Sequence, residues 1–284
     1  MRVNATVNLP VHGVGLGLRR SLLGALAQAP RPVADFLEVA PENWIGLGGR
    51  LARQFRAVAE RYPLICHGLS LNLGGLAPLD TRLLNDLRAF LDANQVQVYS
   101  EHLSACGDHG QLYDLLPVPF TDANVRRIAE RIAQVQDALG RPLIIENVSA
   151  YLTLPGEMSE PEFVAAVLDE ADCNLLLDVN NVYVNSVNLG GEPAAYISAM
   201  PTQRIAYLHM AGHFDAEPGL KIDSHGAAII DPVWALLQHT YACHGVRPTL
   251  LERDFNMPPL DVLQTELQQI RRYQQAATLP AVHA

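Results

Sequence analysis

Short apolar runs alternate with longer amphipathic stretches eight times along the chain. Most of the short runs are continuous, as in "PLII", "NLLLDV" and "TLLE". Such runs are typical of strands buried on both faces of a parallel sheet. The predicted strands are Gly13–Leu18, Asp35–Val39, Pro63–Leu69, Val96–Leu103, Pro142–Asn147, Asn174–Asn181, Arg204–Ala211 and Thr249–Asp254.

The stretches between these strands carry apolar residues at helical spacing. In Asp122–Leu139 they form one stripe, with Thr121 or Asp122 as the N-cap and Gly140 as the C-terminal stop. Weaker helical patterns occur at Arg20–Ala29 and Pro193–Met200. The other predicted helices are Gly49–Tyr62, Asp80–Leu91, Glu160–Ala171, Pro232–His244 and Leu260–Ala276.

Eight strands that alternate with helices predict an α/β fold, a single (β/α)8 TIM barrel. The chain has 284 residues, close to the usual size of this fold, and no linker interrupts it. We therefore expect one barrel domain over residues 1–277 and a flexible C-terminal tail over residues 278–284.

Composition narrows the function classes. The formal net charge of -10 argues against a nucleic-acid ligand, because such proteins usually carry a basic surface. No apolar run approaches the roughly 18 residues of a membrane helix. None of the four cysteines (Cys66, Cys106, Cys173 and Cys243) forms a CxxC pair, so the sequence favours a reduced, cytoplasmic protein without a membrane contact.

Ionisable residues interrupt the strands near their C-terminal ends, where barrel enzymes build their active sites. Burying so many charged groups together requires a compensating charge, and bound cations supply it. Imidazoles and carboxylates together suit zinc, iron or manganese. The residues concerned are His67, His102, Glu146, Asp178, His209, His213, Asp223, His225 and Glu252.

Other candidates favour structural roles. His239 and His244 lie on a helix, away from the strand ends. Cys66 precedes His67 and should face the surrounding helices, because successive strand residues point to opposite sides. Cys106 follows the fourth strand and is the one thiol that we expect near the rim.

Eight separated segments together resemble one known family. They are "DFLEVAPENW", "CHGLSLNLG", "SEHLSACG", "IIENVSAY", "LLDVNNVYVN", "LHMAGH", "DSHG" and "LLERD". In this order they are similar to the multinuclear non-heme iron-dependent oxidative enzymes. The resemblance implies a xylose-isomerase-like TIM barrel that holds two or three irons as mixed Fe(II)/Fe(III), with zinc or manganese as the alternative metals.

The resemblance also implies roles for individual residues. Asp178, His209 and His213 would act in catalysis, with His213 as a substrate contact or a support for the ligands. Asn181 stands where related barrels carry a histidine. The implied metal ligands are His67, His102, Glu146, Asp178, Asn181, His209, Asp223, His225 and Glu252.

The activity implied by the resemblance is natural product biosynthesis. Such an oxidoreductase uses O2 to modify cysteine, or another residue, in a ribosomally synthesised precursor peptide, which a separate partner protein presents. A similar ligand order occurs in trinuclear zinc or manganese phosphodiesterases and endonuclease-like hydrolases. A divalent-metal sugar isomerase and a metal-storage protein are further alternatives.

Overall fold

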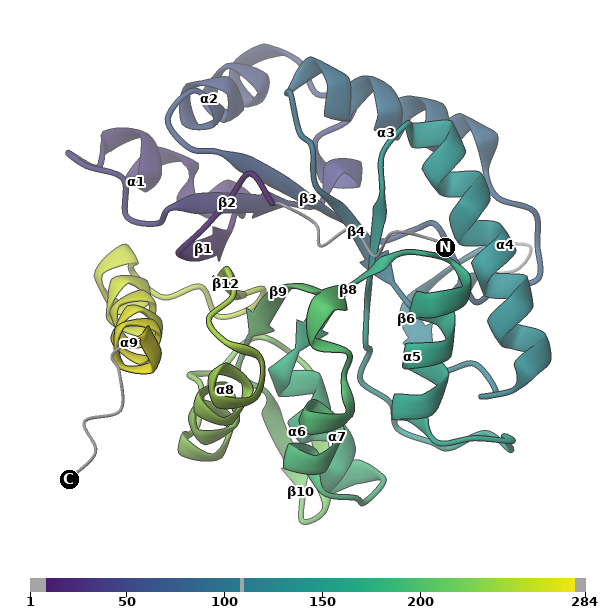
Figure 1. Cartoon of the computed structure of the whole chain (residues 1–284). Helices are drawn as coiled ribbons and strands as arrows, with labels where there is room; N and C mark the ends of the chain where they lie inside the picture. Colours follow the sequence, from purple (N-terminus) through teal and green to yellow (C-terminus); the bar gives the residue numbers. More distant parts are fainter. Residues whose placement is uncertain (1–8, 108–109, 279–284) are drawn as a thin grey trace.

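The computed structural model describes residues 9–107 and 110–278. Eight parallel strands close into a barrel in the order β1-β12-β9-β8-β7-β4-β3-β2 (Figure 1). The predicted TIM barrel is therefore confirmed. The strands are β1 (Val14–Gly17), β2 (Phe36–Val39), β3 (Leu64–Gly68), β4 (Tyr99–His102), β7 (Leu143–Glu146), β8 (Asn174–Asp178), β9 (Ile205–Met210) and β12 (Thr249–Leu251).

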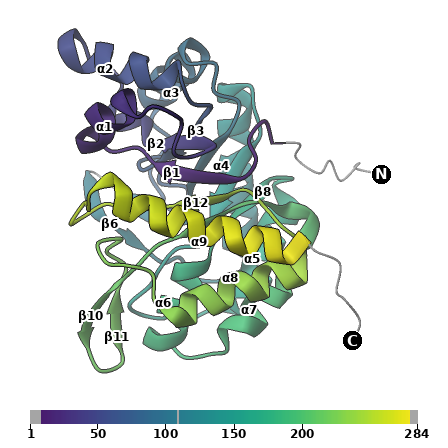
Figure 2. The same ribbon diagram turned by 90° about the vertical axis from the view of Figure 1, so that its left-hand side faces the viewer.

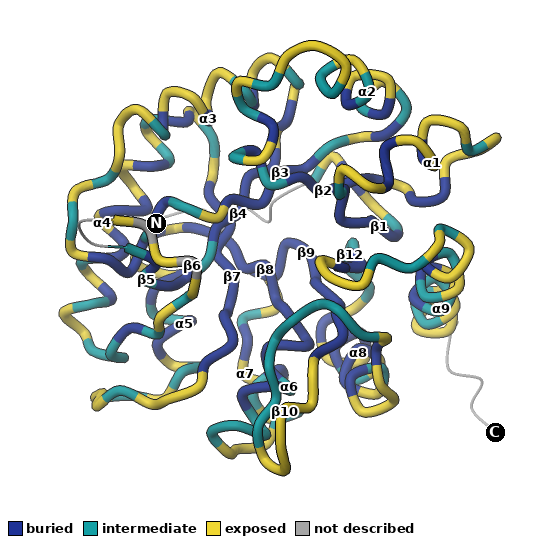
Figure 3. Tube along the Cα trace, turned by 180° about the vertical axis from the view of Figure 1, so that it is seen from behind, coloured by how far each residue is buried: buried dark blue, intermediate teal, exposed yellow. Residues whose placement is uncertain are grey.

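Helices surround the barrel, and their outer faces are exposed while the strands are buried (Figure 3). All the predicted helices form, including the two with weak patterns. Short 3-10 turns lie at Arg20–Leu22, Pro41–Asn43 and Thr202–Arg204. The helices are α1 (Leu23–Gln28), α2 (Gly49–Ala59), α3 (Thr81–Ala93), α4 (Asp122–Leu139), α5 (Glu160–Glu170), α6 (Val179–Asn188), α7 (Pro193–Ala199), α8 (Asp231–His244) and α9 (Leu260–Thr278).

Alternation along the strands divides the apolar residues into two layers. One cluster fills the barrel interior and includes Phe36, Ile65 and Leu176. A larger cluster packs between the strands and the helices and includes Cys66 and Leu177. Neighbouring strand residues belong to different clusters because their side chains point to opposite faces. Cys66 therefore faces the helices, as predicted.

Local capping explains where several helices begin and end. Asp80 accepts hydrogen bonds from the backbone N–H groups of Arg82 and Leu83 at the start of α3. Thr121 accepts one from Asn124 at the start of α4, and Gly140 ends that helix with a φ of 66°. A left-handed residue at this position favours glycine. Both predicted limits of α4 are confirmed.

Several expected element boundaries were wrong. The sixth strand ends at Asp178, and α6 begins at Val179, so Asn181 lies in a helix and not on a strand. Arg204 belongs to a 3-10 turn before β9, and the last strand ends at Leu251. The helix α9 includes Thr278, and the rest of the expected tail lies outside the described residues.

Two β-hairpins extend the loops of the barrel. One joins β5 (Ala105–Gly107) to β6 (Gln111–Leu116), and the other joins β10 (Phe214–Glu217) to β11 (Leu220–Ile222). The sequence analysis missed both. They follow β4 and β9, so they belong to the end of the barrel where the strands terminate, and Figure 2 shows both at the same end. No helix within the described ranges is long and apolar enough to cross a membrane.

Candidate metal centre

A layer of polar side chains lies next to the apolar interior of the barrel, on the side of the C-terminal ends of the strands. Phe36, Ile65, Ile144, Leu176, Tyr207 and Leu250 belong to the interior cluster. Two positions further along each strand stand Glu38, His67, Glu146, Asp178, His209 and Glu252. Because side chains two residues apart share a face, all of these point toward the barrel axis. The fold thus gathers four carboxylates and two imidazoles at the rim.

A first group of ligand atoms comprises His67, His102 and Glu146. His67 Nε2 lies 3.0 Å from Glu146 Oε2 and 3.1 Å from His102 Nε2. His102 Nε2 lies 3.3 Å from the same Glu146 oxygen. Atoms bound about 2.1 Å from one ion lie about 3.0–3.4 Å apart, so the three atoms match one coordination sphere.

His209 lies at the centre of the remaining groups. Its Nδ1 is 3.1 Å from Glu252 Oε2, 3.5 Å from Glu146 Oε1 and 3.9 Å from Asp178 Oδ2. His209 and Asp178 are fully buried. The combinations that could hold an ion are Glu146, Asp178 and His209; Glu38, His209 and Glu252; and Asp178, His225 and Glu252.

The hydrogen bonding of these atoms supports metal binding. Buried donor and acceptor atoms nearly always have a hydrogen-bond partner. Among the described residues, five atoms at this rim have none: Glu146 Oε2, Asp178 Oδ2, Asn181 Oδ1, His209 Nδ1 and His225 Nε2. Except for Asn181, the residues that carry them belong to groups whose ligand atoms lie within 4.8 Å of one another. A cation would satisfy them, so the residues fit a multinuclear centre.

Charge balance leads to the same conclusion. The groups contain four carboxylates (Glu38, Glu146, Asp178 and Glu252) and four imidazoles, which are neutral as metal ligands. Four negative charges equal the charge of two divalent cations. Arg19 reaches the rim from outside, with its guanidinium 3.0 Å from Glu252 Oε1.

Carboxylates orient the histidines of the centre. A carboxylate can only accept a hydrogen bond, so His209 Nε2, 3.1 Å from Glu38 Oε2, carries the proton. The lone pair of Nδ1 then faces Glu146, Asp178 and Glu252. Glu101 Oε1 lies 3.2 Å from His102 Nδ1 and in the same way directs His102 Nε2 into the first group.

A hydrogen-bonded chain joins the two sides of the centre. His67 Nδ1 lies 2.8 Å from Ser100 Oγ, which lies 2.7 Å from the Tyr207 hydroxyl. Tyr207 donates to Glu38 Oε2 at 2.8 Å, and the same oxygen accepts from His209. All five residues are buried. The chain therefore fixes the orientation of both His67 and His209 from inside the barrel.

The pKa directions follow from the crowding of like and unlike charges. Burial opposes the charged form of His102, but the hydrogen bond to Glu101 and the charges of Glu146 and Glu101 raise the pKa of His102 to about 9. Burial and the charge of Glu146 raise the pKa of Asp178 well above its usual value. Protons and cations therefore compete for the same atoms.

Two expected ligands occupy less direct positions. Asn181 Nδ2 donates to the Asn147 carbonyl at 3.1 Å, which leaves Oδ1 without a partner. Asp223 Oδ1 lies 2.7 Å from His225 Nε2, and its oxygens also accept hydrogen bonds from Ser149 and Asn180. Neither Asn181 nor Asp223 belongs to the four groups above. Their role as ligands stays a prediction.

His213 lies beside the centre and not in it. Its Nδ1 is 2.8 Å from Asn180 Oδ1, and its ring lies against that of Tyr183. Asn180 also donates to Asp223, which contacts His225. Burial and the charge of Lys221 lower the pKa of His213. Its Nε2 lies 3.9 Å from Asp215 Oδ1.

The sequence analysis missed two residues of this site. Glu38 stands in "DFLEV" two positions after the inward-facing Phe36, and that spacing is the signal that identifies it. Asp254 Oδ2 lies 3.1 Å from His225 Nδ1 and also pairs with Arg19. No spacing in the sequence predicts that ion pair, because Arg19 and Asp254 meet only when the barrel closes.

The thiols and the two histidines of α8 belong to none of these groups. Cys106 is buried on β5 with its Sγ 3.8 Å from the Leu69 carbonyl, and burial raises its pKa to about 11. It is therefore a protonated thiol at neutral pH. His239 and His244 lie on α8, and both hydrogen-bond to backbone carbonyls of α7.

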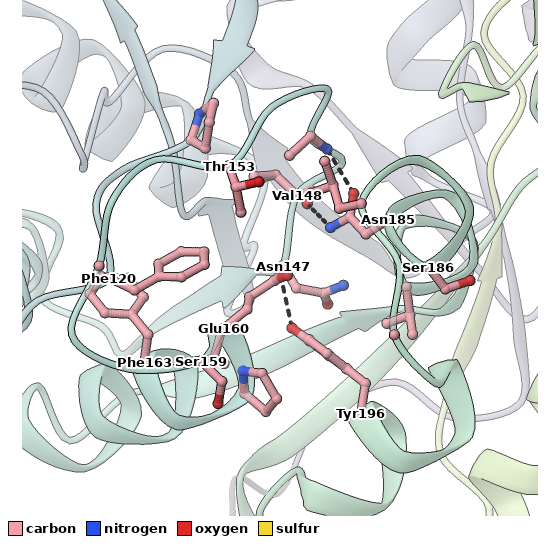
Figure 4. A pocket seen from close by; sticks show the side chains of 18 of the residues that line it. Phe120, Asn147, Val148, Thr153, Ser159, Glu160, Phe163, Asn185, Ser186 and Tyr196 are labelled. Atoms are coloured by element: carbon pink, nitrogen blue, oxygen red, sulfur yellow. Dashed lines mark hydrogen bonds between the residues drawn. The ribbon is translucent and has the colours of Figure 1, made fainter. Parts of the chain in front are cut away.

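Two cavities open beside the centre. A cavity of about 220 Å³ is lined by Glu38, His67 and Glu252, with Arg19, Leu69 and Phe255 at its sides. A larger cavity of about 530 Å³ lies between the β7–α5 loop, α5, α6 and α7 (Figure 4). The smaller cavity gives direct access to the ligand residues, whereas the larger one does not contain them.

The amino-acid sequence is similar to one known protein family and to relatives in other bacteria. The family described as "RiPP precursor modification enzyme MbnB/TglH/ChrH" matches residues 13–275. A UPF0276 protein of Pseudomonas aeruginosa is 64% identical over 264 residues, which cover 93% of this chain and 93% of that protein. A UPF0276 protein of Shewanella loihica is 56% identical and covers 94% of this chain and 96% of its own.

Solved structures with a similar backbone are more distant in sequence. D-psicose 3-epimerase from Clostridium cellulolyticum H10 has a TM-score of 0.57 at 13% identity, covering 94% of this chain and 96% of its own. A xylose isomerase-like TIM barrel protein from Mycobacterium smegmatis in complex with magnesium has a TM-score of 0.58 at 13% identity, covering 94% and 98%. At this identity the likeness shows the fold, which is xylose-isomerase-like.

Proposed function

The chain belongs to the MbnB/TglH/ChrH family of RiPP precursor modification enzymes, and on this premise we propose that it is an iron-dependent oxidase of a cysteine-bearing precursor peptide. RiPPs are ribosomally synthesised peptides that are modified after translation. The observation that carries the proposal is the set of five buried, unpartnered ligand atoms at the barrel rim.

The ligand residues would divide between at least two ions. His67, His102 and Glu146 would hold one. Asp178, His209, Glu252 and His225 would hold the other or others, with Asp223 and Asn181 completing the set. Imidazole and carboxylate ligands suit iron. When bound, a pair of irons would supply the one-electron chemistry with O2 that oxidises the substrate.

The smaller cavity would admit the reacting side chain. Its walls are formed by Glu38, His67 and Glu252, and Leu69 and Phe255 at its edge are 38% and 65% exposed. A volume of about 220 Å³ is enough for a cysteine with part of its backbone but smaller than most cavities for complete small molecules. A peptide that enters side chain first fits this shape.

His213 would support the ligands indirectly, because it does not line this cavity. Its Nδ1 is held by Asn180, which also donates to Asp223 beside His225. A thiolate is the form of cysteine that binds a metal. Asp178 and His209, which are fully buried, would act as metal ligands behind this cavity, and their catalytic roles are those that the resemblance implies.

Exposed apolar side chains surround the mouth of the barrel. They are Leu69, Leu76, Leu112, Leu116, Tyr151, Leu152, Phe214, Ile230 and Phe255, and all lie in segments between the end of a barrel strand and the next helix. Apolar residues gathered around a site mark an interaction surface. They support docking of the precursor peptide together with a separate peptide-presenting protein.

A spectroscopic titration tests the proposal. The iron-loaded protein is mixed with a cysteine-containing candidate peptide or with its Cys→Ser version, and the absorption spectrum is recorded. A sulfur-to-iron charge-transfer band with the cysteine peptide alone, followed by consumption of O2 and a change in peptide mass, is the expected result. Identical spectra with the two peptides would refute a thiolate ligand.

A further inference from the structure

The larger cavity forms a second site beside the metal centre. Its volume of about 530 Å³ lies within the usual range for ligand cavities. Most of its wall is apolar and includes Phe120, Val148, Leu154 and Phe163. Figure 4 shows Phe120, Val148 and Phe163 around a space bounded by the β7–α5 loop and by helices. Apolar walls of this kind accept the hydrocarbon part of a ligand.

One side of the cavity is polar and acidic. Glu160, the first residue of α5, accepts a hydrogen bond at Oε1 from the Tyr196 hydroxyl at 3.2 Å (Figure 4). Asn185 lies beside them and hydrogen-bonds to the backbone of Val148 and Ala150, which holds the β7–α5 loop in place. These contacts fix the position of the carboxyl group of Glu160 in the wall.

Glu160 has no positive partner in the cavity. The lining residues, all within the described part of the chain, include neither lysine nor arginine, and the other acidic one is Glu192. Burial raises the pKa of Glu160 to about 7, which is the consequence of an uncompensated carboxylate. A cation that enters the cavity would therefore gain an ion pair with Glu160.

We propose that this cavity binds a cationic side chain, arginine or lysine, of the same peptide whose reacting residue enters the metal centre. The long hydrocarbon stem of such a side chain packs against the apolar walls, while its charged end reaches Glu160. The inference rests on the proposed peptide substrate. It adds that this peptide carries a basic residue at some distance along its sequence from the residue that reacts.

The two cavities lie on different sides of the ligand residues. The smaller one is formed by segments that follow β1, β2, β3 and β12, and the larger one by segments that follow β4, β7 and β8. Asn147 connects the larger cavity to the centre, since it lines the cavity and exchanges two hydrogen bonds with the backbone of Asp178. A peptide that crosses the mouth reaches both.

A matched pair of peptides tests the inference in the metal-loaded protein. The probes are blocked pentapeptides, one with a central arginine and one with citrulline, its neutral isostere, in an otherwise alanine and glycine sequence. Calorimetric titration at pH 7.5 should show about tenfold tighter binding of the arginine peptide, the usual size of a hydrogen-bonded charge effect. Glu160→Gln should reduce the preference to about twofold or less.

Two controls separate this effect from general electrostatics. Glu170→Gln removes one negative charge at the exposed far end of α5 and should keep the full preference for arginine. In the wild-type protein the preference should also increase between pH 6 and pH 8, as Glu160 ionises. The groups facing it from α6 and α7 are Asn185, Ser186, Glu192 and Tyr196.

Equal binding of the two peptides by the wild type, or an undiminished preference in Glu160→Gln, would overturn the inference. An arginine preference of the wild-type protein that does not change between pH 6 and pH 8 would also overturn the inference. This measurement needs no variant, so it holds even if Glu160→Gln does not fold. Because no probe contains cysteine, the result is independent of oxidation. An arginine preference in a protein that oxidises no cysteine peptide would support this inference and count against the proposed function alone.

Discussion

His209 Nε2 lies 3.1 Å from Glu38 Oε2, although the two residues are 171 positions apart and stand on strands that β1 and β12 separate in the barrel. The contact assigns the proton of His209 to Nε2. It thereby directs the Nδ1 lone pair toward Glu146, Asp178 and Glu252. Glu38 in turn accepts from Tyr207, so the orientation of the central histidine depends on the hydroxyl of a tyrosine.

Tyr207→Phe should therefore weaken metal binding without removing a ligand. Loss of a hydrogen bond that orients a metal-bound histidine typically costs about 10–100-fold in affinity. Competition with a chelator measures this loss. Tyr241→Phe is the control, because its hydroxyl hydrogen-bonds to Thr249 at the beginning of β12, away from the polar layer. Equal loss in the two variants would exclude an orienting role for Tyr207.

The metal content should be iron. Protein expressed in iron-supplemented medium should contain about two to three irons per chain by elemental analysis, because the imidazole and carboxylate ligands suit that metal. Stoichiometric zinc or manganese, with activity independent of iron, would instead favour the hydrolase or isomerase alternatives.

Glu146→Ala should lower the metal content by at least about one ion per chain. Its two oxygens face different groups, Oε2 toward His67 and His102 and Oε1 toward His209, so its loss affects both. Metal analysis of the purified variant is the measurement. His239→Ala on α8 should retain its metal. Metal loss in that variant would contradict the location of the centre.

The stability of the metal-free protein should decrease as the pH rises from about 6.5 to 9. The pKa of His102 is raised to about 9 by Glu101 and Glu146, despite burial. A raised histidine pKa stabilises the fold fully below the unfolded value near 6.5, and this contribution is lost through pH 9. The change is about 3 kcal/mol. Thermal unfolding across this range measures it, and a metal-free protein that gained stability over this range would contradict the prediction.

None of the chain's own thiols should be essential. Burial keeps Cys106 protonated, Cys66 and Cys173 pack between strands and helices, and Cys243 is exposed on α8. Cys106→Ser should keep its iron and most of its turnover of a cysteine peptide, within about threefold of the wild type. Loss of turnover in a variant that retains its iron would assign Cys106 a catalytic role.

The positions of most candidate ligands follow from the sequence alone. His67, Glu146, Asp178 and His209 each stand at the end of an apolar run, and parallel strands in a closed barrel present those ends on one face. Period-two alternation then places them inward. This argument uses only the local hydrophobic pattern, which is visible in the sequence without any information on tertiary contacts.

Tertiary structure decided the rest. The contact of Glu38 with His209 and the pairing of Arg19 with Asp254 require strands from opposite ends of the chain to meet. Asp178 ends β8 and accepts a hydrogen bond from the backbone N–H of Asn181 as the N-cap of α6, although its flanking residues read as strand. The acidic cavity at Glu160 arises from the packing of α5, α6 and α7. Contacts of this kind depend on which side chains meet after the barrel closes and the helices pack, and hydrophobic periodicity does not specify these pairs.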